Sequence, residues 1–176
     1  GTCPSYEKIK NYHDPKKYFM NIHGVGPKNA VKLVKSGFNS IDDLRNCQNI
    51  SEHLNGVQQL GLKYYDDMLL RIPRKEIKLH ETFIKTIIDI CDIPKGSVQF
   101  TIAGSYRRGN DNSGDIDILF CSKDKKKYNI FIDKLKESNY IVDDLARGPK
   151  KYNGLCKYSR NPCRRIDIMY TKPEEY

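Results

Sequence analysis

The chain has 176 residues, with 31 lysines and arginines against 22 aspartates and glutamates, which gives a formal net charge of +9. This length suits one ordinary domain or two small ones. No unbroken apolar stretch approaches the roughly 18 residues that a transmembrane helix needs, so the sequence predicts a soluble protein with no membrane partner. The positive charge favours a polyanionic partner, with nucleic acid as the leading candidate and a merely solubilising surface as the alternative.

Six cysteines are scattered along the chain, without a Cys-x-x-Cys pair and without a histidine at metal-ligand spacing. This pattern indicates neither a zinc site nor a redox motif. Several of them, such as Cys91 and Cys121, close apolar runs, where a reduced cysteine acts as a small hydrophobic residue. We therefore expect a reducing, intracellular compartment, and the nucleus if the protein is cellular. The chain starts without Met, signal segment or transit peptide, which is typical of an excised fragment.

The first part of the chain is predicted to be helical. Residues 1–17 are polar and contain two prolines, as in a tail or a short helix. Further helices are predicted at 18–22, at 27–36 with Pro27 in the first position, after Ser40 in a capping box with Asp43, and at about 57–70. Residues 18–70 therefore form a small helical domain.

The second part, residues 71–176, changes in pattern. A long helix is predicted from Pro73 to a point before Pro94, because its apolar residues recur at spacings of three and four. Period-two alternation then predicts strands at 98–102 and 115–120. An amphipathic helix around 128–135 follows, and further strands are predicted near Ile141, near Leu155 and at 165–170. This mixture is typical of an α/β or α+β domain.

The segment Gly24-Val25-Gly26-Pro27-Lys28 lies between two predicted helices. Its two glycines permit a tight hairpin, and the following helix would present unpaired N–H groups that can bind a phosphate oxygen. Lysines on the following turns add positive charge. A structural turn is the alternative interpretation, but the helical flanks and the lysines favour contact with the phosphate backbone of nucleic acid.

A second motif begins with Gly104-Ser105-Tyr106-Arg107-Arg108-Gly109 and continues with Ser113-Gly114-Asp115-Ile116-Asp117. On a strand, Asp115 and Asp117 project from one face and the isoleucines from the other. Two such carboxylates repel each other unless a cation lies between them, and oxygen ligands suit Mg²⁺ or Mn²⁺. Two solvated acids on an edge strand are the alternative. The upstream glycine, serine and arginines favour a triphosphate site.

The third motif is Arg164-Arg165-Ile166-Asp167-Ile168, which again alternates. Arg165 and Asp167 share one face of a strand, and the isoleucines share the other. If Asp167 lies beside Asp115 and Asp117, it completes three ligands for two metal ions, the number that a two-metal phosphoryl transfer requires.

Together with Gly61-Leu62-Lys63-Tyr64-Tyr65 and Arg71-Ile72-Pro73-Arg74, these motifs occur in the order and approximate spacing of the family X DNA polymerases, which the chain resembles from about residue 14 to its end. The resemblance implies an α+β fold. A helix-hairpin-helix fingers domain at 18–70 would precede a nucleotidyltransferase palm at 71–176, with a mixed sheet and packed helices.

The resemblance also implies site residues. Asp115 and Asp117 match the pair that binds two Mg²⁺ ions, and Asp167 matches the third carboxylate, which helps to activate the primer 3′-hydroxyl. Arg165 matches an arginine that pairs with these aspartates. The residues that match contacts to the incoming triphosphate are Arg71, Ser105, Arg108 and Gly114.

In the hairpin, Gly24, Val25, Gly26 and Lys28 fall in the segment expected to contact DNA. The backbone carbonyls of Met20, Ile22 and Val25 match a site for a monovalent cation, Na⁺ or K⁺, and a DNA phosphate. The implied activity is addition of deoxynucleotides from dNTP to a primer, with a role in DNA repair or gap filling.

The chain departs from the family at both ends. The family's lyase domain has no counterpart before residue 18, and the sequence stops at Tyr176, before the family's thumb. We therefore expect slow or absent unaided polymerisation and weak discrimination among bases. Two alternatives stay open, a catalytically silent DNA-binding module and a nucleotidyltransferase that acts on a small molecule. The hairpin argues against the second, since a small-molecule enzyme has no use for a grip on duplex DNA.

Overall fold

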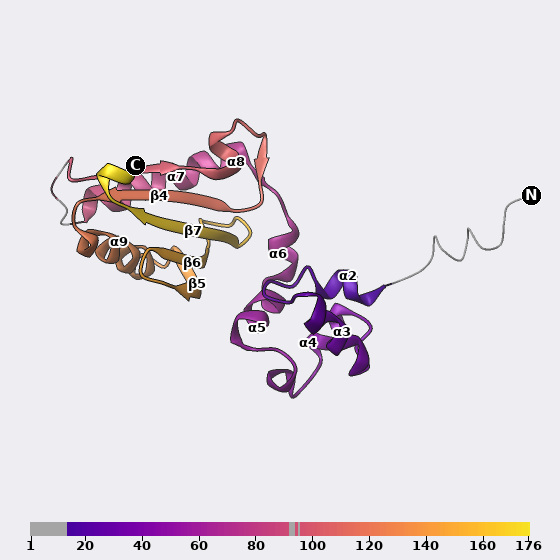
Figure 1. The fold of residues 1–176 in the computed structure, drawn as a ribbon. Helices are drawn as coiled ribbons and strands as arrows, with labels where there is room; N and C mark the ends of the chain where they lie inside the picture. The colour runs from indigo at the N-terminus through magenta and orange to yellow at the C-terminus, as the bar shows by residue number, and fades with distance from the viewer. Residues whose placement is uncertain (1–13, 92–93, 95) are drawn as a thin grey trace, which may run out of the picture. The chain divides into compact units, whose positions relative to one another are not determined.

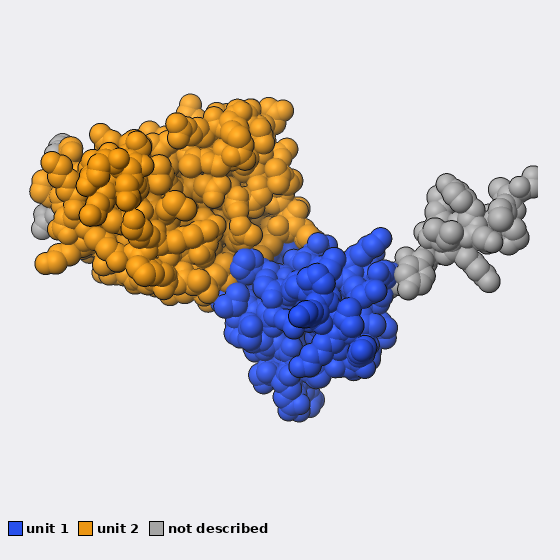
Figure 2. Space-filling view, in the orientation of Figure 1, with its two compact units in different colours: residues 1–65 blue, residues 66–176 orange. Residues whose placement is uncertain are grey.

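The computed structural model describes residues 14–91, 94 and 96–176. The chain divides into two compact units, residues 1–65 and 66–176, each with its own hydrophobic core (Figures 1 and 2). Each unit is therefore described by itself. Residues 1–13 of the predicted tail, which include Cys3, lie outside the described residues.

The first unit is a set of short helices around one apolar cluster. Its elements are α2 (Pro15–Phe19), α3 (Pro27–Lys35), α4 (Ile41–Arg45), the 3-10 turn η1 (Ile50–Glu52), α5 (Gly56–Lys63) and the first residue of α6 (Tyr65–Leu69). The four helices α2 to α5 each bury apolar side chains in this cluster: Phe19, Ala30, Leu33, Leu44 and Leu62. The predicted small helical domain is confirmed.

The N-termini of the helices in this unit show the interactions expected of helix caps. Pro27 is the first residue of α3, as predicted. Ser40 and Asp43 form the predicted capping box, in which the Ser40 hydroxyl accepts from the Asp43 N–H and the Asp43 carboxylate accepts from the Ser40 N–H. The predicted position of the first helix is corrected, because the helix occupies residues 15–19 instead of 18–22. Asp14 caps it by accepting the Lys16 N–H at 3.1 Å.

The prediction of one helix at about 57–70 is also corrected, because two helices occupy this segment. α5 ends at Lys63, its C-cap Tyr64 has a ψ of 19°, which lies outside the helical range, and α6 begins at the next residue. Asp66 and Asp67 occupy the first turn of α6, where negative charge is favourable at a helix N-terminus. The apolar period runs through the break, so hydrophobic spacing alone did not reveal it.

The second unit is an α+β domain built on a five-stranded mixed sheet in the order β2-β4-β7-β6-β5. The strands of this sheet are β2 (Val98–Ile102), β4 (Ile116–Ser122), β5 (Ile141–Arg147), β6 (Lys151–Cys156) and β7 (Arg164–Thr171). Only the β4–β7 pair among them is parallel. The other elements are β1 (Ile72–Pro73), α7 (Arg74–Ile90), α8 (Gly104–Arg107), β3 (Asn112–Ser113), α9 (Lys125–Glu137) and η2 (Pro173–Glu175). The predicted fold class is confirmed.

The start of α7 differs from the predicted one by a single residue. Pro73 has a ψ of 145°, which is extended, and pairs with Asn112 in the small β1–β3 ladder. The helix therefore begins at Arg74, with Pro73 as its N-cap. This ladder joins the start of the unit to the segment that leads into β4.

The two long helices cover one face of the sheet. Side chains from α7, including Ile77 and Ile84, and from α9, including Phe131, join the buried isoleucines of β4 and β7 in one cluster. Over the first five residues of β4 and of β7, buried and half-buried positions alternate. Asp117, Arg165 and Asp167 therefore face the side of the sheet that these helices do not cover.

Candidate active site

Three aspartates meet on the uncovered face of the sheet. Asp117 in β4 and Asp167 in β7 are direct register partners, and Asp115 lies two residues before Asp117 on the same face. Each side chain offers one carboxylate oxygen such that these three atoms lie within 4.8 Å of one another. We call Asp115, Asp117 and Asp167 the aspartate cluster. The parallel pairing brings together residues that the sequence separates widely.

The charges in the aspartate cluster are unevenly compensated. Arg165 forms an ion pair with Asp115. Asp167 accepts a hydrogen bond from the Asn153 amide at 2.6 Å and lies 3.1 Å from the Lys151 ammonium. The Asp117 carboxylate makes no hydrogen bond or ion pair with any described residue. Its pKa is raised, first by desolvation and then by the negative charges of its two neighbouring aspartates.

Gly104 makes room for the cluster. Its φ is +58°, which side chains rarely adopt, and a Cβ atom there would overlap the Asp117 carboxylate. The glycine therefore permits α8 to approach Asp117 closely. This arrangement fits a divalent cation, because three hard oxygen donors converge and no described residue donates to the Asp117 carboxylate.

The residues predicted to contact a triphosphate lie around α8 and β3. The Ser105 hydroxyl donates to Ser113 Oγ at 2.7 Å. Arg71 donates from Nε to Asn112 Oδ1 at 2.8 Å, and its Nη1 lies 3.0 Å from the position of a Cβ at Gly114. The β1–β3 ladder thus holds Arg71 beside Gly114.

Arg108 follows α8 as its C-cap and is exposed. Its guanidinium makes no ion pair within the described part of the chain. Unlike Arg71, it is therefore available to an anionic ligand without breaking a protein contact.

In the first unit, the hairpin between α2 and α3 is built from backbone contacts. We call Gly24–Gly26 the glycine hairpin. Gly24 has a φ of +83°, and its carbonyl accepts the Gln58 amide at 2.8 Å. The Val25 N–H donates to the carbonyl of Ile22 at 3.0 Å, and both of these side chains are buried. Gly26 is exposed, and a Cβ there would meet nothing within 4 Å.

Other residues around this hairpin have separate roles. A Cβ at Gly61 would lie 2.7 Å from the His23 carbonyl oxygen, so this glycine lets α5 approach the hairpin backbone. Met20 and Lys28 are exposed, and the Lys28 ammonium has no ion-pair partner among the described residues. The structure therefore leaves the Gly26–Lys28 surface open to a ligand.

Comparison with known proteins assigns both units. The family model described as DNA polymerase beta palm matches residues 71–173, and the one described as fingers domain of DNA polymerase lambda matches residues 17–69. The chain belongs to the family X DNA polymerases. The family resemblance predicted from the sequence is thereby confirmed.

Individual relatives agree with the family. The chain is 35% identical over 93% of its length to DNA polymerase lambda of Arabidopsis thaliana and 30% identical over 90% to that of Rattus norvegicus. It is 33% identical over 70% of its length to DNA nucleotidylexotransferase of Xenopus laevis. These matches cover 33%, 28% and 23% of the relatives, so the chain spans a third or less of each.

Several residues of this family X palm were not singled out from its sequence. Lys151 and Asn153 contact Asp167, and Asn112 holds Arg71. Lys151 and Asn153 lie on one face of β6, and only the strand order brings that face beside β7. Sequence spacing carries no such information.

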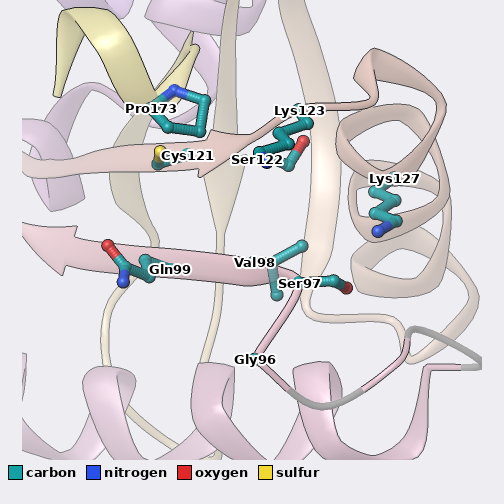
Figure 3. A pocket seen from close by; sticks show the side chains of 9 residues that line it. All are labelled: Gly96, Ser97, Val98, Gln99, Cys121, Ser122, Lys123, Lys127 and Pro173. Atoms are coloured by element: carbon teal, nitrogen blue, oxygen red, sulfur yellow. The ribbon is translucent and has the colours of Figure 1, made fainter.

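A hollow in the palm unit lies beside the end of β4 and the start of β2. It has a volume of about 350 Å³, and its lining includes Val98, Cys121 and Lys127 (Figure 3). Asp117 lies at the start of β4, whereas Cys121 lies near its end. This hollow is therefore separate from the aspartate cluster.

Within the described residues, no helix is both long and apolar enough to cross a membrane.

Proposed function

We propose that this chain supplies the fingers, residues 18–70, and the palm, residues 71–176, of a DNA polymerase that adds deoxynucleotides from dNTP to a primer 3′-hydroxyl, with DNA repair or gap filling as its role. The observation that carries the proposal is the aspartate cluster, in which β4 and β7 bring three carboxylates together on an uncovered face. Membership of family X supports the same reaction.

The residues present fit two divalent ions. Asp115 and Asp117 would hold both ions, and Asp167 would complete the site on the primer side. Bound Mg²⁺, or Mn²⁺ in its place, would lower the pKa of the 3′-hydroxyl and neutralise the triphosphate. Arg165 holds Asp115 in place through its ion pair. The pKa of Asp117 is raised first by burial and then by repulsion from Asp115 and Asp167, and a bound cation would relieve that repulsion.

The anion contacts follow from the positions around α8. Ser105 and Gly114 line the approach to the aspartates, and Arg71 and Arg108 would bind the phosphates that leave as pyrophosphate. The bond from the α-phosphorus to the bridging oxygen breaks as the primer oxygen attacks. The reaction needs no covalent protein intermediate.

The glycine hairpin would bind the DNA backbone. Its exposed Gly26 lets a phosphate approach the backbone closely, and Lys28 adds a charge beside it. The carbonyls of Met20, Ile22 and Val25 are the proposed ligands of a Na⁺ or K⁺ ion there. Five free cysteines among the described residues support a reducing compartment, and the proposed role in DNA repair would place a cellular protein in the nucleus.

The test is Mg²⁺-dependent binding of a fluorescent dNTP, followed by primer extension. We expect the wild-type chain to bind the nucleotide only with Mg²⁺ and Asp117→Asn to lose that dependence. Binding that is equal with and without Mg²⁺, in both proteins, would contradict the proposal. If DNA binding persisted while nucleotide binding was absent, the chain would be a silent DNA-binding module.

A further inference from the structure

Strand β6 lies directly beside the strand that carries Asp167. Asn153 is the register partner of Asp167 across the β6–β7 ladder, so the two side chains rise from the same face of neighbouring strands. The Asn153 amide donates to Asp167 Oδ1 at 2.6 Å. The Lys151 ammonium lies 3.1 Å from the other oxygen, Oδ2. Both carboxylate oxygens of Asp167 therefore have a partner from β6.

The backbone of Asn153 is held by pairing with a strand on each side. Asn153 pairs with Ala146 on one side and with Asp167 on the other, so its strand is interior. The preceding Tyr152 is fully buried, and its hydroxyl donates to Asp144 at 2.5 Å. A short side chain on such a strand has little freedom, so its amide is a fixed donor.

Lys151 differs from Asn153 in freedom and in charge. Its side chain is 48% exposed, whereas that of Asp167 is 15% exposed. A long, exposed lysine can swing away from a carboxylate, which a short amide on an interior strand cannot do. Its positive charge also opposes the arrival of a second cation at the same oxygen.

We propose that Asn153 and Lys151 are positioning residues for Asp167, with opposite effects on a divalent ion. Asn153 fixes Oδ1 and so aims Oδ2 at the cluster. Lys151 neutralises Oδ2 when no divalent ion is bound and yields that oxygen when the ion enters. This inference rests on the proposed function, because it assumes that the aspartate cluster binds metal.

The experiment measures Mn²⁺ affinity without DNA or nucleotide. Mn²⁺ is titrated into the 176-residue chain, and the free ion is followed by its electron paramagnetic resonance signal. Asn153→Leu, which removes the amide at similar volume, should weaken binding about tenfold. Lys151→Gln should tighten binding about threefold, since the opposing charge is partly screened by solvent.

Matched controls separate this effect from charge and from folding. Lys150 neighbours Lys151 in sequence but pairs with Glu175 at 3.4 Å, so Lys150→Gln should leave Mn²⁺ affinity unchanged. Thermal unfolding midpoints are measured for each variant. If Asn153→Leu fails to fold, Asn153→Ala replaces it, because it removes the amide without adding an apolar branch.

The outcomes distinguish the inference from the proposed function. If Asp117→Asn abolishes Mn²⁺ binding while Asn153→Leu binds like the wild type, the role of Asn153 is wrong and the metal site stands. Equal affinity in Lys151→Gln and the wild type would overturn the role of Lys151. If Asp117→Asn leaves Mn²⁺ binding intact, the metal site itself is wrong. A merely structural role for Asn153 would lower the unfolding midpoint without changing Mn²⁺ affinity.

Discussion

The aspartate cluster and the glycine hairpin differ in which atoms carry their proposed chemistry. In the cluster, side-chain carboxylates do so, and the backbone of β4 and β7 serves to align them. In the hairpin, the backbone itself is the binding group, and Gly26 contributes by having no side chain. The two sites should therefore respond to different kinds of substitution. Changes of functional group should damage the cluster, and added bulk should damage the hairpin.

The largest effect is expected in the cluster. In the intact enzyme, Asp167→Ala would remove one proposed metal ligand while leaving the strand intact, so nucleotide incorporation should fall about a thousandfold or more, equivalent to about 4 kcal/mol. DNA affinity should stay within a few-fold of wild type. Primer extension at saturating Mg²⁺ measures the first quantity and a DNA titration the second. Incorporation near the wild-type rate would contradict the assignment of Asp167.

Two neighbouring arginines on β7 allow a residue that stabilises the core to be compared with one on the face of the aspartate cluster. Arg164 points into the core, where its guanidinium donates twice to Glu76 at 2.7 and 2.8 Å, and only 4% of its side chain is exposed. Arg164→Met leaves the largely buried Glu76 carboxylate without its ion-pair partner, and it should lower the unfolding free energy by about 3–5 kcal/mol. Arg165→Met is the matched control on the half-exposed face, and it should cost less than about 1 kcal/mol. Urea denaturation compares the two variants.

The same core predicts a pH dependence through His80. Burial lowers the pKa of His80 from 6.5 to about 4. Between these two values the unfolded chain binds a proton that the folded chain excludes, so stability falls as the pH drops from 6.5 to about 4. The contribution is up to about 3 kcal/mol.

A variant that lacks only His80 tests this origin. In His80→Gln, denaturation midpoints should change less between pH 6.5 and 4 than in the wild type. Parallel pH profiles in the two proteins would assign the acid sensitivity to other groups.

In the hairpin, two glycines should separate folding from binding. Gly24 has a positive φ and Gln58 Cγ would lie 3.3 Å from its Cβ, so Gly24→Ala should lower the unfolding free energy by about 1–2 kcal/mol. Gly26→Val meets no internal neighbour and should fold normally. It should nevertheless weaken binding to all duplex sequences about equally, by about tenfold, because phosphate contacts carry no base information. Selective loss for one sequence would make this segment an ordinary turn.

The smallest effect is expected at Lys28. Its exposed ammonium has no ion-pair partner among the described residues, so Lys28→Ala should leave stability unchanged. If it neutralises one DNA phosphate, the slope of log affinity against log salt should decrease by about one. Titrations at several salt concentrations provide the slope. An unchanged slope would place Lys28 away from the DNA.

Local patterns in the sequence predicted most of the fold because each depends on neighbouring residues. The alternation around Asp117 predicted a strand, and the Ser40 capping box predicted a helix start. The hydrophobic spacing did not predict the break at Tyr64, because the apolar period continues through it. The contacts of Lys151 and Asn153 also escaped, since they depend on which strand lies beside β7. The family resemblance supplied the roles of the aspartates, and the parallel register supplied their proximity.

The order of strands in the sheet has a consequence for how the second unit folds. β7 comes last of its strands in the sequence, yet it lies between β4 and β6. Until it inserts, those two strands have unpaired edges, and Asp167 has neither Asp117 nor Asn153 beside it. Such pairing between distant segments is slow to form because the intervening chain must first be closed into a loop. The proposed metal site should therefore form only after β7 has inserted between β4 and β6.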